Sequence, residues 1–116
     1  MNRREAEAAG RRAEWIAAWW LRLRGWRILA TRARTRAGEV DLVARRGRVL
    51  AFVEVKARSS AEAADLALDE RRLRRVAAAA ELLAARYARE GDSCRVDAVF
   101  VVPGRWPRHL PNVWTG

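Results

Sequence analysis

The sequence has very little cysteine, histidine or lysine. Its 116 residues include one of each, namely Cys94, His109 and Lys56. A single cysteine cannot form an internal disulfide, which favours a reducing compartment such as the cytoplasm. One histidine excludes a histidine-rich metal site and leaves little scope for a Ser-His-Asp triad.

Long apolar segments are also missing. The longest uncharged apolar runs have seven residues, as in Trp15–Leu21, whereas a helix that crosses a bilayer needs about 20. Arginines and glutamates interrupt the first twelve residues, which argues against a secretory signal. We therefore expect a cytoplasmic protein with no membrane partner.

Basic residues are abundant and unevenly distributed. The formal net charge is +10, and residues 1–60 hold 15 basic and six acidic side chains. All basic residues except Lys56 are arginines. A surface this cationic attracts polyanions, and without a membrane the expected partner is nucleic acid, most simply DNA.

The periodicity of apolar residues predicts one α/β domain over residues 1–116, with a mixed β-sheet flanked by helices. Gly25 is placed to end the first helix, Asp69 to cap the second, and Arg46-Gly47 to turn a hairpin. The order is α-β-β-β-α-β, with a further edge strand at the end. The expected helices are 4–24 and 69–90, and the expected strands 26–34, 39–45, 48–58, 94–102 and 108–113.

Two neighbouring strands carry acidic residues and the single lysine. Glu54 and Lys56 lie two residues apart on the best-defined strand and therefore share a face. If the hairpin pairs through Arg46-Gly47, Asp41 lies opposite Val53 or Glu54. Glu39 shares the face of Asp41 and is expected to support the site from outside.

Two close carboxylates repel each other unless a cation neutralises them. Mg²⁺, or Mn²⁺ in its place, binds one or two protein carboxylates together with water and phosphate oxygens. Such an ion polarises a phosphodiester and activates an attacking water, and a lysine can orient that water or meet the developing charge. Each pattern alone is more often a surface ion pair, but together they favour phosphodiester hydrolysis. Glu14 adds a third acid, on an apolar stripe of the first helix where a carboxylate needs a partner.

The segments Gly38–Val43 (GEVDLV) and Phe52–Arg58 (FVEVKAR) resemble the two core motifs of the YraN family of predicted endonucleases. That family is similar to PD-(D/E)xK nucleases, including archaeal Holliday junction resolvases. The resemblance covers nearly the whole chain, from Glu14 to Arg95–Val99. It implies a restriction-endonuclease-like fold and a metal ion bound by Asp41, Glu54 and the Val55 carbonyl. It also implies that Lys56 is the catalytic lysine and Glu14 an outer acid.

Arginines near these motifs are candidates for phosphate contacts, although a solvated arginine-rich face is the alternative. They are Arg32, Arg34, Arg36, Arg45, Arg46 and Arg58. Arginines 71, 72, 74 and 75 at the start of the second helix fit either a phosphate partner or a solvated face. Trp15, Trp19 and Trp20 are expected in the core or in a homodimer contact rather than stacked on bases.

The sequence thus predicts a metal-dependent endonuclease acting on DNA, with branched or junction DNA among its candidate substrates. The alternatives are a non-catalytic nucleic-acid-binding module and an accessory subunit that docks through its first helix.

Overall fold

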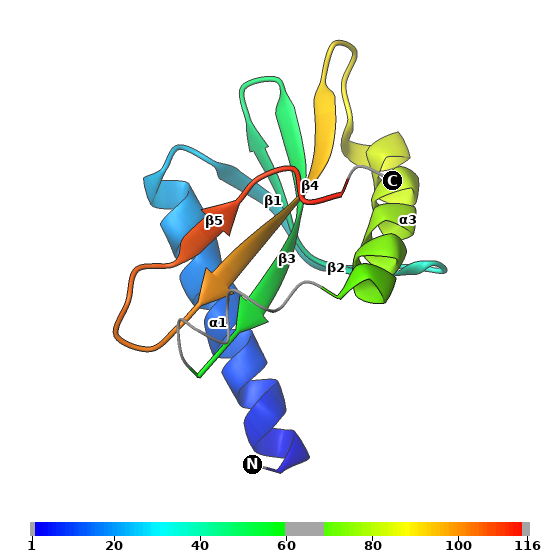
Figure 1. Ribbon diagram of the computed structural model, residues 1–116. Coiled ribbons are helices and arrows are strands. Elements are labelled where there is room, and N and C mark those ends of the chain that lie inside the picture. The colour runs from blue at the N-terminus through cyan, green and yellow to red at the C-terminus, as the bar shows by residue number, and fades with distance from the viewer. Residues whose placement is uncertain (1, 60–68, 115–116) are drawn as a thin grey trace.

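The computed structural model describes residues 2–59 and 69–114 as a twisted sheet with a helix on each face (Figure 1). This is the mixed α/β arrangement that the sequence predicts, and every described element begins and ends within three residues of its expected bounds. The elements are α1 (Arg3–Leu23), β1 (Arg27–Thr35), β2 (Gly38–Arg46), β3 (Val49–Ala57), α3 (Glu70–Tyr87), β4 (Ser93–Val101) and β5 (Arg108–Leu110).

Both helices begin with a side-chain cap. The Asn2 side chain accepts a hydrogen bond from the Glu5 N–H at 2.8 Å, and Asp69 accepts one from the Arg71 N–H at 2.9 Å. After α1 the backbone turns at Gly25, whose φ of +91° favours glycine. No helix in the described part of the chain is both long enough and apolar enough to cross a bilayer.

The five strands are neighbours in the order in which they occur in the chain. β1, β2 and β3 form an antiparallel meander, β3 and β4 are parallel, and β5 is antiparallel to β4. The parallel pair requires a crossover connection, to which α3 belongs.

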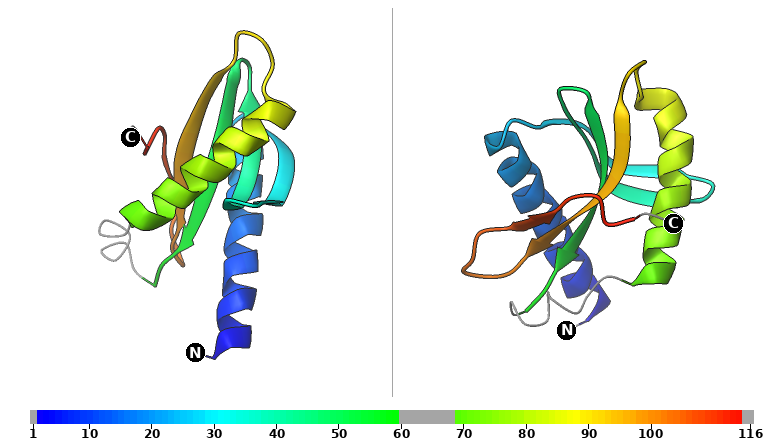
Figure 2. Two further views of the ribbon diagram at one scale, coloured as in Figure 1. Left: turned by 90° about the vertical axis from the view of Figure 1, so that its right-hand side faces the viewer. Right: turned by 45° about the horizontal axis from the view of Figure 1, so that its top comes forward.

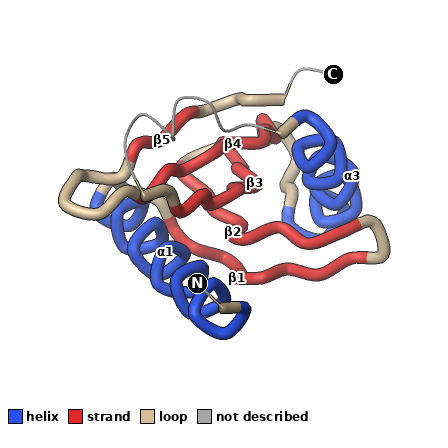
Figure 3. The backbone as a smooth tube through the Cα atoms, turned by 60° about the horizontal axis from the view of Figure 1, so that its bottom comes forward, coloured by secondary structure: helices blue, strands red, loops and turns tan. Residues whose placement is uncertain are grey.

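The helices cover opposite faces of the sheet, as Figures 2 and 3 show from three further directions. α1 packs through Ala17, Ala18 and Leu21 against the face that holds Val53 and Val99. The core on the other face joins α3 to β2, β3 and β4. Its buried residues are Leu73, Val76, Ala79, Ala80 and Leu83 of α3 with Val40, Val43, Leu50, Phe52 and Val96 of the sheet.

The sheet divides where β2 leaves β3. The ladder between these strands runs from Arg46↔Val49 to Leu42↔Val53 and goes no further. β2 nevertheless continues to Gly38, paired only with β1, and the turn between β1 and β2 extends past α3 (Figure 1). We call this opening between β2 and β3 the fork, and the candidate site lies there.

Candidate metal centre

Asp41 lies at the point where the fork begins. It is the residue just beyond the last β2–β3 pair, and the register of that ladder would place it opposite Glu54, as the sequence predicts. Its Oδ2 accepts a hydrogen bond from the Val55 N–H at 2.8 Å. The Asp41 carboxylate thus accepts a hydrogen bond from the backbone of β3 just beyond the end of the β2–β3 ladder. This bond holds Asp41 beside Glu54.

Glu54 is the most buried charged group of the fork, with 1% of its surface exposed. Its Oε1 contacts two cations, the Lys56 ammonium at 3.1 Å and the Arg72 guanidinium of α3. Its other oxygen, Oε2, is buried and has no hydrogen-bond partner. Lys56 is itself largely buried, since only 13% of its side chain is exposed.

The charge of Asp41 is destabilised by its surroundings. Burial, and next the charge of Glu54, raise the pKa of Asp41 to about 7, although the Val55 N–H opposes the shift. The charge of Glu14 acts in the same direction as that of Glu54. Without a bound cation, the site therefore holds a proton near neutral pH that an isolated aspartate would have lost.

Glu14 reaches the fork from the opposite layer. Its Oε1 accepts a hydrogen bond from Arg32 Nε at 3.0 Å, so the partner expected for this acid is an arginine. Arg32 lies between the pairs Thr31↔Leu42 and Ala33↔Val40, hence beside Asp41. Its φ of +49° is unusual for a strand residue with a side chain and places local backbone strain next to the site.

The residues of the fork fit a divalent cation. Two carboxylates are adjacent, one of their oxygens is buried without a partner, and the pKa of Asp41 shows the cost of keeping both charged. Mg²⁺ suits this set because it takes few protein ligands and keeps several waters. No cluster of three or more acidic, histidine or cysteine ligands exists among residues 2–59 and 69–114, so backbone oxygen and water would complete the shell.

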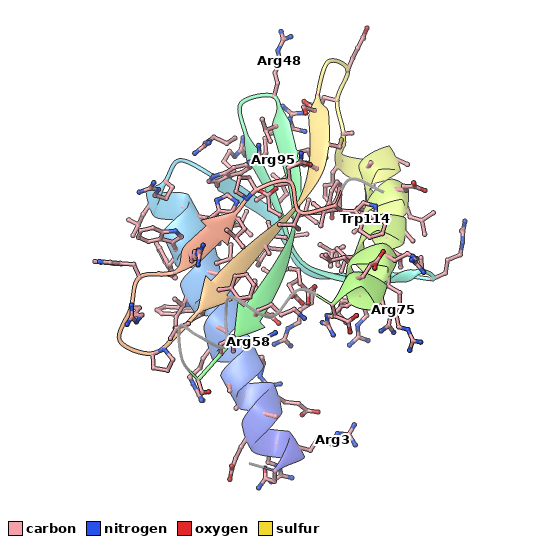
Figure 4. The ribbon with its side chains drawn as sticks, in the orientation of Figure 1. Arg3, Arg48, Arg58, Arg75, Arg95 and Trp114 are labelled. Carbon is pink, nitrogen blue, oxygen red and sulfur yellow. The ribbon has the colours of Figure 1, made fainter. Side chains whose placement is uncertain are left out.

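The candidate phosphate-contacting arginines fall into two groups. Arg32 and Arg34 lie on β1 beside the fork and Arg36 is exposed in the following turn, whereas Arg58 follows β3 at the lower end of that strand (Figure 4). Arg34 is exposed and lies 3.7 Å from Glu39, which is half exposed at the edge of the site.

Arg45 and Arg46 lie at the other end of β2, about 13 and 17 Å along the strand from Asp41. Arg45 is a correction to the sequence analysis, because its buried guanidinium binds Asp92 at 2.7 and 2.9 Å and has no surface to offer a phosphate. Arg46 lies over the Trp26 ring, 4.7 Å from its centre. The hairpin arginines are therefore remote from the fork, as Arg48 and Arg58 at opposite ends of β3 illustrate (Figure 4).

Arg72 is the residue whose role the sequence did not reveal. It is one of four arginines at the start of α3, and nothing in their spacing marks the one that contacts Glu54. The periodicity of α3 partly indicates which of these arginines faces the sheet. Arg72 precedes Leu73, which packs on the sheet, so its side chain starts close to the interface between helix and sheet.

A buried acid outside the fork, Asp97 of β4, has a separate set of partners. Its carboxylate is fully buried and accepts hydrogen bonds from Arg95 Nε at 2.9 Å and from the Asn112 N–H at 2.9 Å. His109 Nε2 lies 2.7 Å from its other oxygen. Arg95 and Asp97 thus form an ion pair within β4, and His109 of β5 joins it.

Comparison with known proteins agrees with the motifs in the fork. The model described as "Uncharacterised protein family UPF0102" matches residues 13–101, a range that includes Glu14, Asp41, Glu54 and Lys56. The chain belongs to UPF0102. This confirms the resemblance to the YraN family, which is the same family.

UPF0102 proteins from several bacteria are similar over nearly their whole length. The relative from Sphingopyxis alaskensis is 62% identical over 114 residues, 98% of each chain. The one from Rhizorhabdus wittichii is 61% identical over 117 residues, 100% of this chain and 99% of the relative. A third, from Erythrobacter litoralis, is 53% identical over 98% of each chain.

Proposed function

We propose that this UPF0102 protein is a divalent-metal-dependent endonuclease that hydrolyses phosphodiester bonds in DNA, with branched or junction DNA among its substrates. The observation that supports this most directly is the fork itself. There the Asp41 carboxylate, held by the Val55 N–H, lies beside a buried Glu54 that is bound to Lys56.

In this proposal Asp41 and Glu54, with the Val55 carbonyl, hold one Mg²⁺ or Mn²⁺. When bound, the ion would polarise the scissile phosphate and lower the pKa of a nucleophilic water. Binding would remove the proton that Asp41 otherwise keeps near neutral pH, because the charge of the ion replaces that proton.

The side chains of the fork then divide the remaining tasks. Lys56 is held by Glu54 at the site, where its ammonium can orient the attacking water or meet the charge that develops on phosphorus. The Arg72 side chain is half exposed, so it can contact a bound phosphate while it remains on Glu54. Arg32, Arg34, Arg36 and Arg58, which lie on or directly after β1 and β3, would position the backbone of the nucleic acid.

Partners and location follow from the same reasoning. We propose DNA as the polyanion, no membrane partner, and the cytoplasm as the compartment, where the free and exposed Cys94 would remain reduced. A homodimer is compatible with the proposal but is not required by the fork, whose acids and cations all come from one chain.

The first test is calorimetry with Mg²⁺ or Mn²⁺, comparing wild type with Asp41→Asn, followed by cleavage assays on branched and linear DNA. We expect the substitution to abolish metal binding and cleavage, and Lys56→Gln to abolish cleavage while metal binding survives. Glu90→Gln is the matched control, since it removes an exposed acid beyond the far end of α3. Absence of metal binding by the wild type, even with DNA present, would refute the catalytic proposal and leave a nucleic-acid-binding module.

A further inference from the structure

The solvent-facing side of α1 combines arginine with exposed tryptophan. The helix buries Ala13, Ala17, Ala18 and Leu21 against the sheet. On its outer side Trp15 and Trp19 are 65% and 47% exposed, although the sequence analysis expected them in the core or a dimer contact. Aromatic side chains of this size rarely remain in water without a binding role when they adjoin one another.

These tryptophans belong to a continuous stripe, which we call the outer stripe. Its members follow one another at three- and four-residue steps and lie within an arc of about 80°. None of the three glutamates of α1, which the structure describes throughout, lies on it. The outer stripe consists of Arg4, Ala8, Arg11, Trp15, Trp19 and Arg22.

The two rings and one of the arginines already contact each other. The ring centres of Trp15 and Trp19 are 6.3 Å apart with an interplanar angle of 66°. The Arg22 guanidinium lies 5.1 Å from the centre of the Trp19 ring. The aromatic surface is therefore held in place at one end by a cation, and another exposed cation, Arg11, lies one turn before Trp15.

Glu14 connects α1 with the fork. Trp15 follows Glu14, whose carboxylate binds Arg32 beside Asp41. A nucleic acid whose scissile phosphate lies at Asp41 and Glu54 would reach Trp15 by crossing the Glu14–Arg32 pair. Positive charge attracts the phosphates, whereas aromatic faces can stack only on bases that are not already paired and stacked in a duplex.

We propose that the outer stripe binds an unpaired arm of the substrate, with bases stacked on Trp15 and Trp19 and phosphates bound by Arg11 and Arg22. This inference rests on the proposed nucleic-acid substrate and specifies its class as DNA with a single-stranded segment next to the cleaved bond.

The test measures binding of fluorescent 12-nucleotide oligonucleotides in EDTA, where no metal-dependent cleavage occurs. Three probes separate the sources of affinity: a single strand, its duplex, and a single strand of equal length without bases. The variants are Trp15→Ala/Trp19→Ala, the ring-conserving Trp15→Phe/Trp19→Phe, and Trp106→Ala. Trp106 is the matched control because it is 78% exposed and lies outside α1.

We expect the double alanine variant to bind the single strand at least roughly tenfold more weakly. Its binding of the duplex and of the strand without bases should stay unchanged, the phenylalanine variant should keep most of the affinity, and Trp106→Ala should resemble wild type. Equal losses on all three probes, or no loss on the single strand, would overturn the inference. So would a change of oligomeric state on sedimentation without a base-dependent loss, since the stripe would then be a protein contact.

Failure of this inference is distinguishable from failure of the proposed function. Base-dependent binding in EDTA requires neither a bound metal nor cleavage, so it tests the outer stripe whether or not the fork is catalytic. A chain that never cleaves DNA can still show base-dependent binding through Trp15 and Trp19. Conversely, cleavage without base-dependent binding would refute the outer stripe alone.

Discussion

At the scale of single residues, the fork contains three acidic and three basic side chains, and one buried carboxylate oxygen, Glu54 Oε2, has no hydrogen-bond partner. Glu14 is paired with Arg32, and Glu54 with Lys56 and Arg72. Asp41 is stabilised mainly by a backbone N–H, which is a weaker compensation for a buried carboxylate than a full positive charge. Asp41 is therefore the group whose protonation responds most to a bound cation.

The first prediction concerns the pH dependence of stability in a metal-free buffer. Folding raises the pKa of Asp41 from 3.8 to about 7, so the folded chain keeps a proton that the unfolded chain releases. Between about pH 4 and pH 7 the free energy of unfolding should therefore fall as pH rises, relative to Asp41→Asn, on the order of 2–4 kcal/mol in all. Urea denaturation of both proteins at pH 4, 5.5, 7 and 8 measures this difference.

Added Mg²⁺ should reverse the effect for wild type at pH 8 and leave Asp41→Asn unchanged, because the ion replaces the proton. Parallel stability curves for the two proteins across this range would contradict the prediction.

The second prediction separates Asp97 from the metal centre. Burial raises the pKa of Asp97, but hydrogen bonds from His109, the Asn112 N–H and Arg95 more than offset this, so its pKa lies below the ordinary value. Its stabilising effect is thus present above about pH 4 and is lost as pH falls through its lower folded pKa. Asp97→Ala should reduce the free energy of unfolding by about 3–5 kcal/mol, since it leaves buried donors unpaired.

Chemical denaturation measures that loss, and calorimetry should show that metal binding by the folded variant persists. Loss of metal binding with unchanged stability would instead assign Asp97 to the site. His109 and Asn112 both follow β4, so this acid anchors the C-terminal segment to the sheet.

The sequence predicted the acids and the lysine of the fork because alternation along strands and a hairpin turn together fix which residues are opposite. It did not predict Arg72, since helix α3 could approach Glu54 with any of several neighbouring arginines. Nor did it predict that Arg45 of β2 is buried, because its partner Asp92 lies 47 residues later, between α3 and β4. Contacts that depend on how elements pack are the ones that local patterns leave undetermined.

At the scale of elements, the β1–β2 hairpin determines the position of Asp41. Its turn is stabilised by Thr35, whose Oγ1 donates to the Gly38 carbonyl at 2.8 Å and accepts from the N–H groups of Ala37 and Gly38. Gly38 has a φ of +150° and lies close to the backbone of Arg75 in α3. The glycine thus allows the hairpin to pass beside α3 and to leave β3.

The third prediction is that Gly38→Ala destabilises the protein by about 1 kcal/mol or more, because a residue with a side chain is strained at this φ. Thermal or urea denaturation measures the change. Gly10→Ala is the control, since a Cβ there meets nothing within 4 Å, and in a helix it should stabilise by about 0.5–1 kcal/mol. Equal responses at the two positions would contradict this account of the hairpin.

The secondary-structure elements themselves follow closely from the sequence. Apolar periodicity, the Asp69 cap and Gly25 mark the helices, and the Arg46-Gly47 turn fixes the β2–β3 register. The point where β2 leaves β3 could not be predicted in this way. Beyond Leu42, β2 continues paired with β1 alone, and no local pattern in the sequence marks that point.

At the scale of the whole molecule, the net charge of +10 should make nucleic-acid binding strongly dependent on salt. The fourth prediction is that Arg34→Ala, at the edge of the fork, reduces the slope of log K against log salt by about 0.7–0.9. Fluorescence anisotropy between 50 and 300 mM salt, roughly the range over which such slopes are resolved, measures it. Arg86→Ala, in the last turn of α3, is the control and should leave the slope unchanged.

An unchanged slope in Arg34→Ala, or an equal reduction in Arg86→Ala, would indicate that the charge acts diffusely over the surface rather than through contacts at the fork.

The scarcity of lysine allows chemical modification to be directed to one side chain of the candidate site. Lys56 is the only side-chain amine in the chain; its side chain is 13% exposed and its ammonium is bound to Glu54. An acylating reagent directed at amines can therefore modify one side chain only, and its rate there reports how tightly that side chain is enclosed. Mass spectrometry of the digested protein would follow this acylation separately from that of the N-terminal amine, without any introduced label.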